Sequence, residues 1–227
     1  MDSIFLDNNI VIGFCFNAEP QHAFALNIFN HNFNRLWSNN VEYEFQKIYH
    51  RKIDKFGDLI FKLIIKIRNE RVLTKNELIK IAKHLNIDGF GYYQCSKIIS
   101  GIWDSFLFEN NHFKTNEIIS AIKKYEKKFN KLSIKNYTLV FKNLGNAYER
   151  ILEYPIVESN LKDVVNGKDN LRKLGGDMNI CLDAHELGEK IPKLNFCTDD
   201  NKFLDNSVII CNHTKIYKII GIEDYIF

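Results

Sequence analysis

Two short apolar runs lie near opposite ends of the chain, and each stops at a carboxylate. The first, residues 4–6, ends at Asp7, and the second, residues 194–197, ends at the sequence Thr-Asp-Asp at 198–200. Short apolar runs closed by polar turn residues are typical of buried strands. Because parallel neighbours bring their carboxyl ends to one edge of a sheet, we expect these two acidic ends to meet there.

The chain between these runs carries helical patterns. The sequence TKNE at 74–77 is a capping box, and apolar residues recur at helical spacing before and after it. We therefore expect residues 50–150 to be helical, with no clear strand. After this block, a helix is expected from the two glycines at 175–176. Strands are then expected at 194–198, 207–211 and 215–222.

This order of elements predicts an α/β fold whose sheet uses both ends of the chain. We expect a single α/β domain in the 227 residues, formed by about 1–50 and 150–227, with a helical insertion at about 51–149.

Charge is divided in the same way. Residues 47–140 hold 19 basic and 9 acidic side chains, a balance of +10, whereas the rest holds 12 and 19, a balance of −7. A basic middle between acidic ends favours a polyanionic partner. The alternative is a set of lysine-rich helices with a solvated face.

Five scattered cysteines, with no CxxC pair, indicate buried thiols in a reducing compartment. The N-terminus lacks the basic region of a targeting signal, and lysines interrupt the longest apolar stretch. The expectation is a cytoplasmic protein with no membrane partner.

Carboxylates recur at the edges of the predicted elements. Asp7 follows the first strand, Glu44 lies on the helix after Ser38, Asp177 starts a late helix, and Asp199 and Asp200 follow a late strand. Clustered carboxylates raise one another's pKa, and a hard divalent ion such as Mg²⁺ or Mn²⁺ removes that conflict. The chemistry implied is phosphodiester hydrolysis by metal-bound water. Each residue also has a simpler interpretation as a turn residue, a helix cap or a solvated side chain.

These residues resemble the motifs of the PIN-domain nucleases. LDNNIVIGF is similar to the family's opening strand with Asp-x-Asn, and SNNVEYEF to its Val-x-x-Glu helix. GDMNICLDA is similar to its Asp-x-x-Ile-x-x-x-Ala helix start, and FCTDDNKF to its Thr-x-Asp-x-x-Phe. The resemblance covers roughly residues 1–50 and 170–227.

The resemblance implies a Rossmann-like, three-layer fold with a central, mostly parallel sheet, and an Mg²⁺- or Mn²⁺-dependent endoribonuclease. The implied metal residues are Asp7, Glu44, Asp177 and Asp200, with Asn9 and Thr198 orienting them. Many members are toxins of toxin–antitoxin pairs, so an antitoxin or inhibitor protein and a homodimer are further expectations.

Three departures from the family pattern stand out. The helical block is larger, and the interval from Asp177 to Thr198 is longer than usual. The third departure is Asp183, a second candidate on the same helix as Asp177; separately from these departures, Asp199 is a further metal candidate beside Asp200. Six residues turn a helix by about 600°, so Asp183 points about 120° away from Asp177. We expect it to face outward into solvent.

Within this hypothesis the basic block holds the RNA backbone, single-stranded or structured, over the acidic site. The candidate side chains are Arg51, Lys52, Lys123, Lys124, Lys127 and Lys128. Tyr92, Tyr93 and Trp103 are available for stacking on bases, although Trp103 is expected in the core.

Two other hypotheses stay open. The first is a non-catalytic RNA-binding or assembly module on a degenerate PIN fold. The second is a structural helical protein with incidental acids.

Overall fold

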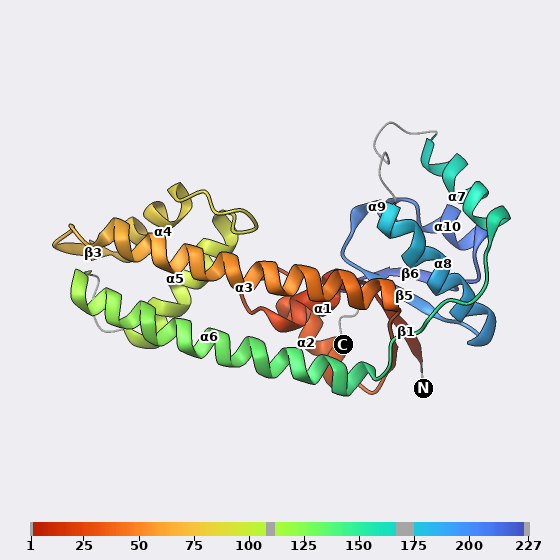
Figure 1. The fold of residues 1–227 in the computed structure, drawn as a ribbon, viewed down its shortest axis with the longest axis horizontal. Coiled ribbons are helices and arrows are strands. Elements are labelled where there is room, and N and C mark those ends of the chain that lie inside the picture. The colour runs from red at the N-terminus through yellow and green to blue at the C-terminus, as the bar shows by residue number, and fades with distance from the viewer. Residues whose placement is uncertain (1, 108–111, 167–174, 225–227) are drawn as a thin grey trace. The chain divides into compact units, whose positions relative to one another are not determined.

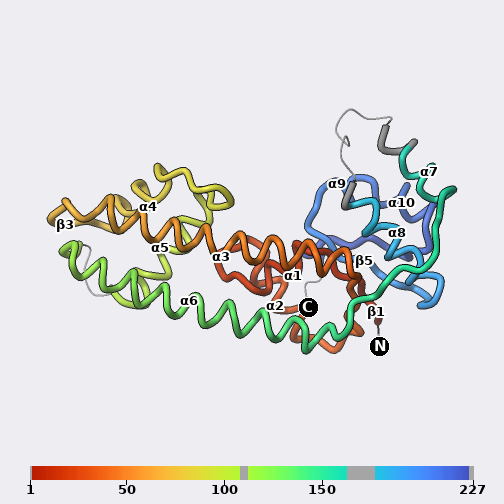
Figure 2. Tube along the Cα trace, in the orientation of Figure 1, coloured from red at the N-terminus to blue at the C-terminus, as the bar shows by residue number. Residues whose placement is uncertain are grey.

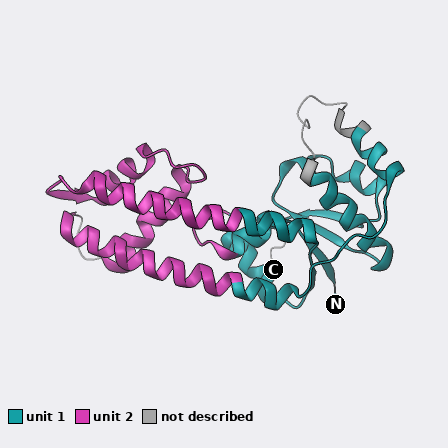
Figure 3. Ribbon diagram, in the orientation of Figure 1, with its two compact units in different colours: residues 1–14, 21–47, 138–227 teal, residues 15–20, 48–137 magenta. Residues whose placement is uncertain are grey.

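A computed structural model describes residues 2–107, 112–166 and 175–224 (Figures 1 and 2). The chain divides into two compact units, shown in Figure 3. Unit 1 contains residues 1–14, 21–47 and 138–227, and unit 2 contains 15–20 and 48–137. The expected insertion at about 51–149 overlaps unit 2, but the structure assigns residues 15–20 to unit 2 and 138–149 to unit 1.

Unit 1 is an α/β structure built on a four-stranded, fully parallel sheet with the order β2-β1-β5-β6. The strands are β1 (Ser3–Leu6), β2 (Asn34–Leu36), β5 (Asn195–Thr198) and β6 (Lys218–Gly221). β1 and β5 pair directly, with Phe5 opposite Phe196. The predicted α/β class and central parallel sheet are therefore confirmed, and the two ends of the chain meet in this sheet.

The two central strands carry apolar residues at their buried positions: Ile4, Phe5 and Leu6 in β1, and Phe196 and Cys197 in β5. Phe5 and Phe196 are both fully buried, and their rings meet edge to face with centroids 5.5 Å apart. This packing holds the carboxyl ends of β1 and β5 next to each other.

Helices connect and surround these strands. Unit 1 contains α1 (Asn8–Cys15) apart from its last residue, and α2 (His22–Asn30), which together lead from β1 to β2. The later helices of unit 1 are α7 (Pro155–Asn166), α8 (Gly175–Lys190), α9 (Asn201–Asp205), α10 (Ser207–His213) and the 3₁₀ turn η1 (Ile222–Asp224).

Two long helices contribute residues to both units. They are α3 (Asn39–Ile67) and α6 (Thr115–Leu144). Unit 2 adds α4 (Lys75–His84) and α5 (Tyr92–Phe106). Its core includes the stacked rings of Phe56 and Phe129, with centroids 3.8 Å apart. Trp103 is buried in this unit, as expected.

The predicted capping box is confirmed at the start of α4. The Thr74 hydroxyl accepts from the backbone N–H of Glu77, and the Glu77 carboxylate accepts from the backbone N–H of Thr74. The signal is local, so it could be recognised without knowledge of the fold.

Two predicted assignments were wrong. Residues 207–211, expected as a strand, lie in α10, where Ile210 is the buried residue of the helix. The middle block contains two strands, β3 (Val72–Thr74) and β4 (His112–Lys114), paired antiparallel. At 207–211 the tertiary context overrides strand propensity, and at 72–74 and 112–114 two short segments far apart in the chain become strands by pairing with each other.

None of the helices in the described part of the chain combines the length and the apolar character that a bilayer crossing requires.

Candidate active site

Asp7 lies at the centre of a polar cluster at the carboxyl edge of the sheet. It follows β1, is 3% exposed, and its backbone N–H donates to Cys197 O on β5 at 3.0 Å. Its Oδ2 accepts from the hydroxyl of Thr198 at 2.7 Å, and its Oδ1 accepts from the backbone N–H of Asn8 at 2.6 Å. Both carboxylate oxygens are therefore held by the chain itself.

Asn8 connects this carboxylate to α3. Its Nδ2 donates to Glu44 Oε2 at 2.6 Å. The side chain is 8% exposed, and its Oδ1 is buried with no hydrogen-bond partner among the described residues. Turning the amide round would place Oδ1 against an ionised Glu44, so this contact sets the orientation. The site therefore contains an unpaired acceptor beside its acids.

Asp177 and Asp200 come from α8 and from the start of α9. Asp200 caps α9: its Oδ1 accepts from the backbone N–H of Lys202 at 2.8 Å. Its own N–H donates to the hydroxyl of Thr198 at 3.0 Å. The Lys202 ammonium lies 3.6 Å from Asp177 Oδ2. Thr198 thus bonds both Asp7 and the backbone of Asp200.

Charge repulsion connects these acids: Asp177 and Asp200 act on Asp7, and Asp177 acts on Glu44. Burial is the largest cause that raises the pKa of Asp7, from 3.8 to about 7; the charges of Asp177 and Asp200 add to the rise, although the hydrogen bonds from Thr198 and Asn8 oppose it. Burial also raises the pKa of Glu44, with Asp177 contributing. The pKa of Asp177 is raised by burial and then by Asp200, against the lowering effect of Lys202. A cation placed among these groups would relieve the repulsion.

The residues fit a hard divalent ion by the chemistry of their donors. Asp7, Glu44, Asp177 and Asp200 supply carboxylate oxygens, and Asn8 supplies an unpaired amide oxygen. Among the described residues, no three Asp, Glu, His or Cys side chains already stand in a metal-ligating cluster.

Comparison of this chain with protein-family models, with curated proteins and with solved structures finds no match.

Asn9 was predicted to orient the carboxylates, but its neighbour takes that position. The carbonyl of Asn9 accepts from Gln21 Nε2 at 3.2 Å, whereas the side chain that contacts Glu44 is that of Asn8. Successive helix residues point about 100° apart, so the phase at which α1 begins decides which asparagine faces the acids. Asp199 is exposed. Partial desolvation is the largest cause that raises its pKa, and the charge of Glu223 adds to the rise.

Asp183 does not face solvent, which corrects the expectation. It is 1% exposed; its Oδ1 accepts from Arg150 Nε at 3.0 Å and its Oδ2 from Asn40 Nδ2 at 2.8 Å. The predicted rotation away from Asp177 holds, but that side of α8 is covered by the segment after α6. One Asp183 oxygen accepts from Arg150 of this segment and the other accepts from Asn40 of α3, so Asp183 joins these two elements to α8 rather than joining the acidic cluster.

Glu186 on α8, which the sequence analysis did not select, holds the same segment. It is fully buried and accepts from the Tyr148 hydroxyl, from the Lys190 ammonium at 3.0 Å, and from two backbone N–H groups. Those groups belong to Ile151, at 3.3 Å, and Leu152, at 2.9 Å. Burial alone would raise the pKa of Glu186, but these hydrogen bonds bring it to about 2. We call residues 148–152 the strap.

The predicted RNA-binding side chains lie in unit 2. Arg51, Lys123, Lys124, Lys127 and Lys128 are exposed. Lys52 differs, because its ammonium lies 2.6 Å from Glu19 Oε1 and its side chain is 15% exposed. Its charge is therefore neutralised within unit 2.

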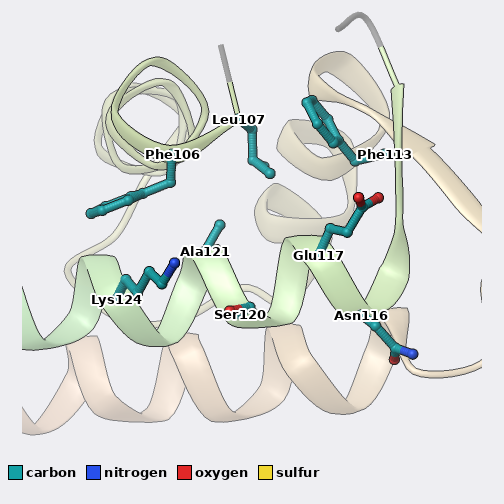
Figure 4. A pocket seen from close by; sticks show the side chains of 8 residues that line it. All are labelled: Phe106, Leu107, Phe113, Asn116, Glu117, Ser120, Ala121 and Lys124. Carbon is teal, nitrogen blue, oxygen red and sulfur yellow. The ribbon is translucent and has the colours of Figure 1, made fainter. Parts of the chain in front are cut away.

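Two pockets in unit 2 each contain one of these lysines. Lys124 lines a pocket of about 410 Å³ between the end of α5, β4 and α6, whose walls combine apolar side chains with polar ones, including the carboxylate of Glu117 (Figure 4). Lys128 lines a smaller pocket of about 120 Å³ between α5 and α6.

Proposed function

We propose that this chain is a metal-dependent endoribonuclease on a PIN-like fold, with Asp7, Glu44, Asp177 and Asp200 as its acidic site. The observation that carries the proposal is the position of Asp177 and Asp200 close enough to the buried Asp7 for their charges to raise its pKa, with Glu44 joined to the same site by the Asn8 amide. The four sequence motifs that resemble PIN nucleases supply the same residues in the same order.

A bound Mg²⁺ or Mn²⁺ would offset charge on the phosphodiester and increase the acidity of water. The chain's own groups position the acids. The Thr198 hydroxyl donates to one Asp7 oxygen, and the backbone N–H of Asn8 donates to the other. The side-chain amide of Asn8 donates to Glu44 Oε2. Glu44 Oε1 is left to accept a proton from water, and the raised pKa of Glu44 suits that role.

Lys202 adds a positive charge next to Asp177. Its ammonium lies at 3.6 Å in an incompletely buried pair, with the Lys202 side chain 47% exposed. Such a side chain can turn from a carboxylate to a phosphate oxygen without leaving a buried charge unpaired. Its role in the proposal is to hold the non-bridging oxygens of the substrate.

Cleavage of a labelled RNA in Mg²⁺ or Mn²⁺, with EDTA as the blank, tests the proposal. Asp7→Asn and Asp200→Asn are expected to lower the rate by about 100-fold or more. Asparagine also caps helices, so Asp200→Asn leaves α9 capped. Asp199→Asn is the matched control and should stay within about threefold of wild type. Full activity in Asp7→Asn and Asp200→Asn, or in EDTA, would overturn the assignment.

A non-catalytic RNA-binding module is the second candidate, and the charge of unit 2 favours it. Unit 2 holds 18 basic and 10 acidic side chains, a balance of +8. This candidate predicts salt-sensitive RNA binding with no metal-dependent turnover in the same assay.

The resemblance to PIN-domain nucleases is the only support for two further parts of the proposal, which are that the protein is a toxin and that it forms a homodimer. Expression in a bacterial host should arrest growth for the wild type and not for Asp7→Asn. Size-exclusion chromatography with light scattering measures the oligomeric state. Unimpaired growth with the active protein would remove the toxin role and leave the nuclease intact.

A further inference from the structure

Unit 2 exposes two adjacent tyrosines, and each has a lysine over its ring. Tyr92 and Tyr93 open α5 and are 60% and 42% exposed. The ammonium of Lys97, one turn along α5, lies 5.4 Å from the Tyr93 ring centroid, and that of Lys83 on α4 lies 5.1 Å from the Tyr92 centroid. Exposed rings next to cations combine a stacking surface with positive charge.

Lys97 also lines the pocket of about 120 Å³ between α5 and α6. Lys128 faces the same pocket from α6, and Ser105, Asn17 and Tyr125 provide further polar groups. Lys97 therefore contacts the Tyr93 ring and also lines the pocket.

Gly101 shapes this pocket. A Cβ at that position would lie 2.7 Å from Cε2 of Tyr125, so only glycine allows the ring to pack this close to α5. The Tyr125 hydroxyl is in turn hydrogen-bonded to Asn17. The close Gly101–Tyr125 contact and this hydrogen bond hold one wall of the pocket in place.

No carboxylate of the described residues neutralises the charge of the two pocket lysines. Neither Lys97 nor Lys128 forms an ion pair with a carboxylate among the residues that the structure describes, in contrast to Lys52 with Glu19. Two lysines and a serine that line a small pocket favour a compact anion such as a backbone phosphate.

We propose that Tyr93, Lys97 and Lys128 form a binding site for single-stranded RNA. A base stacks on Tyr93, and the adjoining phosphate occupies the pocket between Lys97 and Lys128. Stacking on a side chain requires an unpaired base, which selects single strands over duplexes. The choice of RNA as the ligand rests on the proposed function. The site itself lies within unit 2, and RNA binding there needs no metal.

The test is fluorescence anisotropy of a labelled 12-nucleotide oligouridine with the full chain in EDTA, where metal-dependent cleavage is suppressed. Tyr93→Ala should weaken binding about tenfold, and Tyr93→Phe should restore it to within about twofold, because stacking needs only the ring. Lys97→Gln and Lys128→Gln should each weaken binding several-fold. Each should also reduce the slope of log affinity against log salt by about 1.

Lys66→Gln is the matched control, since it removes the same charge from an exposed position on α3 of unit 2 and should change affinity less than about twofold. Circular dichroism verifies that each variant is folded. Wild-type affinity in the Tyr93→Ala/Lys97→Gln double variant, or equal binding of duplex RNA, would overturn the site. Asp7→Asn separates the two proposals, because it should abolish cleavage and leave this binding unchanged.

Discussion

The hydroxyl of Thr198 donates to Asp7 Oδ2 at 2.7 Å, across 191 positions of sequence. The two residues follow or end adjacent parallel strands, and both are buried. The same hydroxyl accepts from the backbone N–H of Asp200. One threonine thus links the two acidic ends of the chain into one site.

Thr198→Val tests this link. Valine keeps the shape but removes the hydroxyl, so Asp7 loses one donor and the Asp200 N–H loses its acceptor. We expect a loss of about 1–3 kcal/mol in the free energy of unfolding, measured by urea denaturation, and at least a tenfold slower cleavage. Thr198→Ser keeps the hydroxyl and should be close to wild type. Equal stability and rate in the valine variant would contradict the link.

The raised pKa of Asp7 predicts a pH dependence of the metal-free protein. The folded state holds the proton up to about pH 7, whereas the unfolded state releases it near 3.8. Between these values the folded state binds more protons, so the free energy of unfolding should fall as pH rises from 4 to 7 and then level off. Urea denaturation at a series of pH values measures this.

Asp7→Asn should flatten that part of the profile. At pH 8 the variant should unfold at a higher urea concentration than wild type, with a free energy of unfolding higher by about 1–2 kcal/mol. Adding Mn²⁺ at pH 8 should stabilise the wild type and have less effect on the variant. A variant with the same slope as the wild type between pH 4 and 7 would show that another group titrates.

Asn8→Ala and Asn9→Ala form a matched pair of neighbours. Removing the Asn8 side chain takes away the donor to Glu44 and the unpaired Oδ1, so both the cleavage rate and Mn²⁺ affinity should fall by about tenfold or more. Isothermal titration of Mn²⁺ provides a measurement independent of activity. Asn9→Ala should change both by less than about threefold. A larger loss in Asn9→Ala than in Asn8→Ala would instead support Asn9, the residue predicted from the motif.

Glu186→Gln tests the strap. The glutamine loses the charge that accepts from Tyr148, Lys190 and the two backbone N–H groups. We expect a cost of about 2–4 kcal/mol at pH 7, measured by urea denaturation. The folded pKa of about 2 lies below the usual 4.5, so the contribution of Glu186 is present above pH 4.5 and is lost as pH falls toward 2. The exposed Glu149→Gln is the control. If Glu186→Gln were as stable as Glu149→Gln, Glu186 would not stabilise the protein by holding the strap.

Features that depend on neighbouring residues in the chain were predictable from sequence. The strand at β1 followed from a short, continuous apolar run, and the start of α4 followed from the reciprocal pattern of Thr74 and Glu77. The pairing of β1 with β5 was expected from the matching positions of their acids, because parallel strands align their ends.

Other features depended on which segment lies alongside. Residues 207–211 have strand-forming composition, but they form a helix, with Ile210 buried. The sequence predicted Asp183 as a solvated helix residue, whereas in the structure it accepts hydrogen bonds from Arg150 and Asn40. Between Asn8 and Asn9, one helical step separates the residue that holds Glu44 from the one that does not. Sequence alone determined strands β1 and β5, the capping box of α4 and the acidic ends of the two strands, because these features are local. Only the tertiary structure decided which polar side chains are buried together, because that depends on contacts between residues far apart in the chain.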